Sequence, residues 1–136
     1  MSKIFNNLWL GGCDDVYDPN FIRYVLPTHI INCTLQERMY YGEISSVRHR
    51  IPLVDDDTDN IELIKEGAKK LEEYMNEKDS KVIVHCAAGI SRSATVVLTW
   101  MILYKNYTFD EAYKYVSNIR TIIRPNNHYM KFLKSL

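Results

Sequence analysis

The chain has 136 residues, of which 46% are hydrophobic and 25% are charged, a composition typical of one globular domain spanning residues 1–136. The length excludes a second sizeable domain, and no apolar run reaches the ~20 residues that a membrane-spanning helix needs. The net charge is zero, but residues 1–80 carry −6 and residues 81–136 carry +6, so we expect any anion-binding site in the second part.

Strand-like and helix-like patterns alternate in the first part of the chain. Short, nearly continuous apolar runs indicate buried strands, whereas apolar residues at helical spacing indicate amphipathic helices. The elements predicted in this way are a strand at 4–10 closed by Gly11-Gly12, a helix at 20–25 opened by Asp18-Pro19, strands at 29–33 and 47–53, an acidic loop at 55–60, a helix at 61–77 and a buried strand at 81–84.

Helices dominate the rest of the chain. Residues 93–104 are apolar almost all round, which is typical of a central, buried helix. Thr108 and Glu111 have the spacing of a capping box and predict a helix that runs to about residue 119. Pro125-Asn126 predicts the start of a last helix, to about residue 134. The order of elements predicts the α/β class, with a central, mostly parallel twisted sheet flanked by helices.

Residues 84–93 have the pattern of an anion-binding loop that carries a nucleophile. A buried strand runs directly into Cys86, Gly89 permits a tight turn, and an apolar helix begins at Ser93. A strand, a loop and a helix N-terminus in this order turn backbone N–H groups toward a bound anion. The spacing of six residues from Cys86 to Arg92 is weak evidence alone, and its surroundings make it specific.

This position predicts a reactive thiolate. The loop N–H dipoles, the helix N-terminus and the Arg92 guanidinium favour the charged form, so we expect the pKa of Cys86 to lie below the ~8.5 of a free cysteine. The same donors suit the three non-bridging oxygens of a phosphoryl group, which Cys86 would attack in line to give a phosphocysteine. The predicted phosphate-binding residues are Ala87, Ala88, Gly89, Ile90, Ser91 and Arg92.

The run HCAAGISRS, residues 85–93, resembles the signature of the cysteine-dependent protein tyrosine phosphatases, and specifically that of the small atypical dual-specificity phosphatases. The resemblance covers nearly the whole chain and includes LWLG at 8–11, IINCT at 30–34 and PN at 125–126. The stretch IPLVDD at 51–56 most resembles viral members related to the poxvirus dual-specificity phosphatase. The resemblance implies a hydrolase of phosphorylated proteins that needs no metal and no cofactor.

The resemblance also implies residue roles. Cys86 matches the nucleophile, and Arg92 matches the residue that clamps the phosphate. Ser93 matches the hydroxyl that eases departure of the thiolate, and His85 the histidine that fixes the loop and helps to keep the pKa of the cysteine low. Asn126 matches the asparagine that braces the loop, and it is equally well placed to be a helix N-cap.

A general acid is also required, because a poor leaving group such as a serine alkoxide needs a proton. The acidic loop offers Asp55, Asp56, Asp57 and Asp59, and composition does not choose among them. The register of the resembled family places the acid six residues before the first apolar residue of the following helix, Ile61. That register selects Asp55, with Asp56 as the alternative.

The loop side chains indicate the class of substrate. Ala87, Ala88 and Ile90 are uncharged, which favours monoester phosphates over polyphosphorylated lipid headgroups. Two other functions stay open. An RNA 5′-triphosphatase of related fold carries a His and an Asn where Ala88 and Ser91 stand. A non-catalytic phosphoprotein-binding module would be expected to lack its nucleophile or its acid. No basic run is interleaved with aromatic residues, so we expect no nucleic-acid partner.

Other features bear on partners and location. The three cysteines fit neither a disulfide framework nor a zinc site, and the first seven residues lack the apolar region of a signal peptide, so we expect a reduced cytoplasmic or nuclear protein, or a virion protein if viral. The chain lacks the N-terminal helix through which some viral relatives dimerise, so we expect a monomer, or a dimer built from another surface. Tyr40 and Tyr41 either flank the phosphorylated residue or lie in an exposed loop. Phe132 stands where many relatives have Gln.

Overall fold

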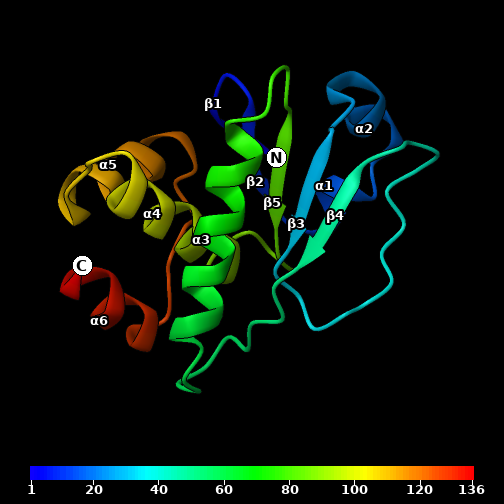
Figure 1. The fold of residues 1–136 in the computed structure, drawn as a ribbon. Helices are drawn as coiled ribbons and strands as arrows, with labels where there is room; N and C mark the ends of the chain where they lie inside the picture. Colours follow the sequence, from blue (N-terminus) through cyan, green and yellow to red (C-terminus); the bar gives the residue numbers. More distant parts are fainter.

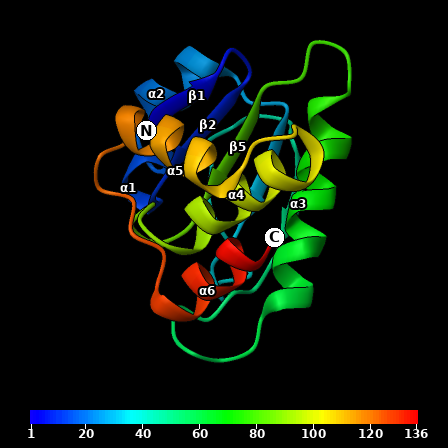
Figure 2. The same ribbon diagram turned by 90° about the vertical axis from the view of Figure 1, so that its left-hand side faces the viewer.

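The structure, a computed structural model that describes residues 1–136, has five strands in one sheet and six helices (Figures 1 and 2). No helix is both long enough and apolar enough to cross a bilayer. The strands are β1 (Ser2–Phe5), β2 (Leu8–Gly11), β3 (His29–Asn32), β4 (Val47–Arg50) and β5 (Val82–His85), and the helices are α1 (Cys13–Val16), α2 (Pro19–Val25), α3 (Ile61–Met75), α4 (Arg92–Tyr104), α5 (Phe109–Ile119) and α6 (Asn127–Ser135).

The strand order is β1-β2-β5-β3-β4, which places β5 at the centre. Only the β1–β2 pair is antiparallel, and the other three pairs are parallel. The predicted α/β class with a mostly parallel sheet is therefore confirmed. The carboxyl ends of β2, β5, β3 and β4 lie at one edge of the sheet, where ligands usually bind in open parallel sheets.

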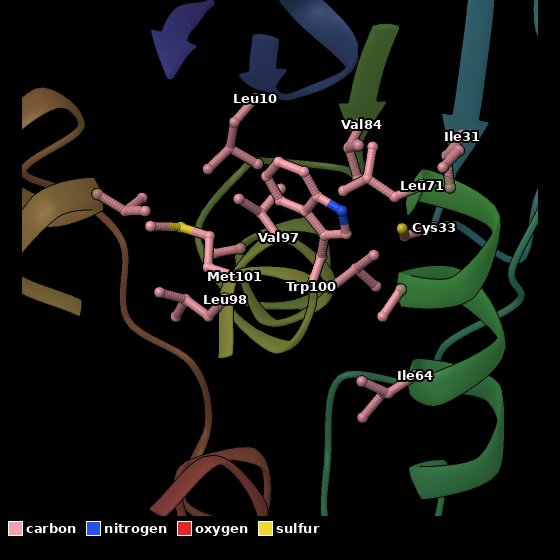
Figure 3. Packing of buried hydrophobic residues seen from close by; sticks show 14 of the residues in the cluster. Leu10, Ile31, Cys33, Ile64, Leu71, Val84, Val97, Leu98, Trp100 and Met101 are labelled. Carbon is pink, nitrogen blue, oxygen red and sulfur yellow. The ribbon is translucent and has the colours of Figure 1, made fainter. Parts of the chain in front are cut away.

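Both faces of the sheet are covered, as parallel strands require. The alternation along each strand sends Leu10 and Val84 toward α3, α4, α5 and α6, where 26 buried residues form the main core (Figure 3). Trp9 and Ile83 point to the opposite face, where α1 and α2 cover a second cluster of seven buried residues. The sheet is thus rigidly held at the strand that leads into Cys86.

α4 is the central helix that its composition predicts. Every side chain from Ser93 to Met101 is buried, and in Figure 3 Val97, Leu98, Trp100 and Met101 project from α4 into the core. Truncating such a side chain to Ala typically destabilises a domain by about 2–5 kcal/mol. The helix that follows the Cys86 loop is therefore among the best-anchored parts of the molecule.

The capping signals predicted from sequence are confirmed. The Asp18 side chain accepts a hydrogen bond from the Asn20 N–H at the start of α2. Thr108 and Glu111 form the reciprocal capping box of α5, and the Asn126 side chain caps α6. Each of these contacts is local, which is why spacing alone was enough to predict it.

Two strand predictions are wrong in their extent. Residues 4–10 do not form one strand, because polar Asn6 and Asn7 make a turn between β1 and β2, and the two strands pair as a hairpin. The strand predicted at 47–53 ends at Arg50, because Pro52 has no N–H to donate to the ladder. Ile51 and Leu53 are buried as coil rather than as strand.

The helices also differ from the predictions, in two boundaries and in one short helix that was not expected. α3 ends at Met75 instead of 77, and Asp79 then adopts a left-handed conformation (φ 59°) that turns the chain toward β5. α4 begins at Arg92 rather than Ser93. The four-residue helix α1 was not predicted at all, because Gly12 and Cys13 gave only a turn signal.

Candidate active site

The loop from Cys86 to Ser91 connects β5 to α4 and turns its carbonyl groups away from the sulfur. The Arg120 guanidinium, at the end of α5, donates to the carbonyls of Gly89 (Nε, 2.8 Å) and Ala88 (Nη2, 3.1 Å). Its third nitrogen donates to Ser2 Oγ at 3.1 Å, which ties the loop to β1. One arginine therefore fixes two consecutive peptide groups of the loop.

Backbone donors hold the neighbouring carbonyls in the same way. The Cys13 N–H donates to the Ala87 carbonyl at 2.8 Å, and the Arg124 N–H donates to the Ile90 carbonyl at 2.8 Å. The Cys13 thiol also donates a hydrogen bond to the Cys86 carbonyl, with an S···O distance of 3.4 Å. With every carbonyl from residue 86 to 90 engaged outside, the N–H groups are left for the interior of the loop.

Those N–H groups form a set of hydrogen-bond donors that can bind an anion. The N–H of Gly89 donates to Cys86 Sγ at 3.2 Å. The N–H groups of Ala87, Ala88, Ile90 and Ser91 make no hydrogen bond within the protein. Successive free N–H groups at the start of a buried helix are the usual means by which a protein binds phosphate.

Gly89 is the residue that makes this turn sterically feasible. Its φ of +68° lies in the left-handed region, and a Cβ there would come within 2.5 Å of Arg120 Nη2 and 2.6 Å of the Gly11 carbonyl carbon. Any side chain at position 89 would therefore push the loop away from both β2 and Arg120.

The Cys86 thiol is almost completely buried at the bottom of the loop. Burial alone would raise its pKa, but hydrogen bonds from Ser93 and from the Gly89 N–H, together with the charge of Arg92, outweigh burial and lower the pKa below its ordinary value. Ser93 Oγ lies 3.1 Å from the sulfur and is itself fully buried. These contacts therefore favour the thiolate form of Cys86.

Alkylation is expected to discriminate sharply among the three thiols. The pKa of Cys13 is raised by partial burial and by Cys86, and burial raises the pKa of Cys33 well above its ordinary value. Iodoacetamide near neutral pH should therefore modify Cys86 first, with a rate that rises through a midpoint below the ~8.5 of free cysteine. Peptide mapping by mass spectrometry measures the site and the midpoint.

The Ser93→Ala variant supplies the control for that experiment. Loss of the hydroxyl removes a hydrogen bond that favours the thiolate, so the alkylation midpoint should move to higher pH. Preferential modification of Cys13 in the wild type, or an unchanged midpoint in the variant, would contradict the assignment of the lowered pKa.

His85 supports the loop as a neutral residue. Burial lowers its pKa to about 4, so the imidazole carries no charge near neutral pH. Its Nε2 lies 2.8 Å from the Tyr41 hydroxyl, and Tyr41 is buried, which rules out the exposed-loop interpretation of that residue. Tyr40, in contrast, is exposed. His85 therefore fixes the loop through hydrogen bonding rather than by adding positive charge beside the sulfur.

Arg92 and Asn126 meet the loop from α4 and from the start of α6. Arg92 is the first residue of α4, and its guanidinium donates weakly to the Leu53 carbonyl at 3.4 Å. The Asn126 N–H, not its side chain, braces the loop by donating to Ser91 Oγ at 3.0 Å. The Asn126 side chain instead caps α6 and donates to Asp55 Oδ1 at 2.9 Å.

The carboxylates of the acidic loop differ in their hydrogen-bond partners. Hydrogen bonds from the Thr58 side chain and from the Thr58 N–H, which lies 2.7 Å from Asp56 Oδ1, lower the pKa of Asp56. Asp59 Oδ1 accepts from the Ile61 N–H at the start of α3. These two carboxylates stabilise the local chain. Asp55 is the one whose carboxylate contacts Asn126, next to the catalytic loop.

Arg120 and Tyr41 are the site residues that sequence reasoning missed. Arg120 lies 31 residues after Gly89, and Tyr41 lies 44 residues before His85, so no spacing rule connects either residue to the loop. Arg120 directly follows the helix predicted to finish at 119. It is one of several cations in residues 81–136, so the sequence did not distinguish it. The structure contains no group of three or more His, Cys, Asp or Glu residues arranged to hold a metal ion.

Comparison with known proteins agrees with this geometry. Residues 8–136 match the family described as “Dual specificity phosphatase, catalytic domain”. A probable dual specificity protein phosphatase of Dictyostelium discoideum is 31% identical over 136 residues, which is 98% of this chain and 33% of that protein. A tyrosine phosphatase homologue of Invertebrate iridescent virus 6 is 47% identical over 57 residues, 42% of this chain and 40% of the viral protein. The chain spans about a third of the Dictyostelium protein, and the aligned segment covers less than half of the viral protein.

The fold has the same counterparts. The crystal structure of human DUSP28 superposes with a TM-score of 0.88 at 18% identity, covering 99% of this chain and 94% of that one. At this level of identity the likeness shows the shared α/β architecture, with the sheet and helices in the same arrangement.

Proposed function

Since the chain belongs to the family of dual specificity phosphatase catalytic domains, we propose that it hydrolyses phosphotyrosine, phosphoserine and phosphothreonine monoesters of proteins through a phosphocysteine intermediate. The observation that carries this proposal is the loop that follows β5. Its sulfur is contacted by the Gly89 N–H and the Ser93 hydroxyl, which favours the thiolate form, and its other N–H groups are left free for the phosphoryl oxygens. The nucleophile and the hydrogen-bond donors for the phosphoryl oxygens are therefore preorganised in one segment.

In the first step, Cys86 Sγ attacks phosphorus in line, so an S–P bond forms as the P–O bond to the substrate breaks. The three non-bridging oxygens accept hydrogen bonds from the loop N–H groups and from the Arg92 guanidinium. Asp55 gives its proton to the leaving oxygen, which departs as a neutral phenol or alcohol.

In the second step, water attacks the phosphocysteine. The Asp55 carboxylate takes a proton from that water as the new P–O bond forms and the S–P bond breaks. The Ser93 hydroxyl, 3.1 Å from the sulfur, donates to the departing thiolate. Inorganic phosphate leaves, and the thiolate and the protonated Asp55 are restored for the next turnover.

The chain's own groups supply the positive charge that this reaction needs. In this mechanism Arg92 and the N–H dipoles at the start of α4 stabilise the phosphoryl group, while Ser93 and Gly89 contact the sulfur. We therefore propose a reaction that needs neither a metal ion nor a cofactor.

The surroundings of the loop favour monoester phosphates on proteins. The side chains of Ala87, Ala88 and Ile90 are exposed and uncharged, so these loop residues add no charge to match a polyphosphorylated headgroup. We propose a monomeric catalytic unit, because the loop, Arg92 and Asp55 of a single chain supply every role in the mechanism above. Three free cysteines, one of them an activated thiolate, suit the reducing cytoplasm or nucleus.

The test is hydrolysis of an activated aryl phosphate and of matched phosphotyrosine, phosphoserine and phosphothreonine peptides in the presence of EDTA. We expect turnover of all four substrates, and acid quenching should trap phosphate on the peptide that contains Cys86. A folded wild-type protein that hydrolyses none of them but removes the γ-phosphate of an RNA 5′-triphosphate would overturn the proposal.

A further inference from the structure

A basic cavity lies beside the catalytic loop and has no place in the mechanism above. It has a volume of about 340 Å³ and is formed at the ends of β3 and β4 and by the segment between them. Three arginines line it, Arg38, Arg48 and Arg50, together with one acidic residue, Glu37. Three cations and one anion thus share this cavity, although residues 1–80 as a whole carry a net charge of −6.

The positive charge of the cavity is only partly compensated. Glu37 lies 3.5 Å from Arg50 at the closest approach, and the second contact of Arg50 is with a neutral carbonyl, that of Leu35. The Arg48 guanidinium stacks over the Tyr41 ring at 4.9 Å, and its hydrogen-bond acceptors are a serine hydroxyl and a backbone carbonyl. Arg38 is exposed, and its side chain forms no ion pair. An anion entering the cavity therefore meets unneutralised guanidinium groups.

The register of the sheet fixes the distance from the backbone of Arg50, which lines this cavity, to the backbone of His85, the residue before Cys86. His85, which precedes Cys86, is paired with Asn32, and Asn32 is paired with Arg50. Neighbouring strands lie about 4.8 Å apart, so the backbone of Arg50 lies roughly 10 Å from that of His85 at the same edge of the sheet. An extended peptide rises about 3.3 Å per residue, so this span corresponds to about three residues of a bound substrate.

We infer that this cavity is a subsite for an acidic side chain of the substrate, an Asp or Glu about three residues from the phosphorylated position. The inference rests on the proposed phosphatase function and adds a sequence preference to it. The guanidinium groups of Arg48 and Arg50 bind the carboxylate, while the phosphorylated residue occupies the Cys86 loop. Substrates of this chain are accordingly acidic phosphopeptides.

The experiment compares three phosphotyrosine peptides of identical length. One carries Asp three residues before the phosphotyrosine, one carries Asp three residues after it, and one carries Asn at both positions. Dissociation constants are measured with the Cys86→Ser protein, so binding is read without turnover. We expect one Asp peptide to bind about two- to fivefold more tightly than the Asn peptide, the range of an exposed ion pair. In 1 M salt this ratio should fall toward one.

Variants that should change the Asp/Asn ratio of binding in opposite directions separate loss of the subsite from misfolding. Arg48→Gln and Arg50→Gln should each reduce the Asp/Asn ratio toward one. Glu37→Gln should increase it, because it removes the only carboxylate of the cavity, and a misfolded protein does not gain selectivity. Lys114→Gln is the matched control, since Lys114 is an exposed cation on α5, across the sheet, and should leave the ratio unchanged.

The outcomes separate this inference from the proposed function. An Asp/Asn ratio near one in the unsubstituted cavity, or one that Arg48→Gln, Arg50→Gln and Glu37→Gln all leave unaltered, overturns the subsite. Failure of the wild type to hydrolyse an aryl phosphate overturns the phosphatase function, and the binding ratio still decides whether the cavity recognises acidic peptides.

Discussion

Replacing Cys86 by Ser is expected to abolish turnover of every phosphate monoester, with a loss on the order of 10⁴-fold or more in kcat. The serine hydroxyl has no accessible anionic form near neutral pH, so the hydrogen bonds from Gly89 and Ser93 that hold a thiolate have no charge to stabilise. No S–P bond forms, and acid quenching should trap no phosphoprotein. Steady-state hydrolysis of an aryl phosphate measures the loss directly.

The fold and the anion site should survive this change. The substitution replaces sulfur by oxygen in a loop whose carbonyls are still fixed by Arg120, Arg124 and Cys13, so thermal stability and phosphate binding should stay close to those of the wild type. Cys33→Ala is the matched control, because it removes another buried thiol, one without a side-chain hydrogen bond, and should keep most of the activity. Equal losses in the two variants would show that thiol chemistry at residue 86 is not the cause.

The region around Cys86 was predictable from sequence because its determinants are local. A buried strand, a glycine that adopts positive φ and an apolar helix follow one another within residues 82–104, and their order alone orients the loop. The lowered pKa of Cys86 was expected for the same reason, since Gly89, Ser93 and Arg92 lie within seven residues of it.

Long-range contacts were beyond any sequence pattern. Tyr41 sits in a polar stretch that gives no sign of burial, yet its hydroxyl lies against His85 and its ring is covered by Arg48. The expectation that anion-binding groups lie in the second part of the chain agrees with the role proposed for the Cys86 loop. It overlooks Arg48 and Arg50, because net charge along the sequence does not report which side chains the sheet brings together.

The run of four aspartates shows a third situation, in which sequence supplied the candidates and contacts distinguish them. The register of the resembled family favoured Asp55, with Asp56 as the alternative. The carboxylates of Asp56 and Asp59 accept hydrogen bonds from nearby backbone N–H groups. The carboxylate of Asp55 instead accepts from the side chain of Asn126, 71 positions away. Asp55 therefore remains our prediction for the general acid.

Replacing Asp55 by Asn is expected to slow hydrolysis according to how much the leaving group needs a proton. For phosphoserine peptides, whose alkoxide is a poor leaving group, kcat should fall by roughly 10²-fold or more. For an activated aryl phosphate, whose phenolate leaves unaided, the loss should be much smaller. The two kcat values, measured on one preparation of the variant, give the ratio that identifies a proton donor.

Asp56→Asn is the matched control for this experiment, because it removes a carboxylate from the adjacent position of the same exposed loop. Its hydrogen-bond donors both belong to Thr58, and an amide oxygen can accept the same bonds, so both substrates should be hydrolysed at nearly the wild-type rate. A strong dependence on the leaving group in Asp56→Asn but not in Asp55→Asn would move the acid by one position. Equal losses for both substrates in Asp55→Asn would instead indicate that its contact with Asn126 positions the loop and that the proton comes from elsewhere.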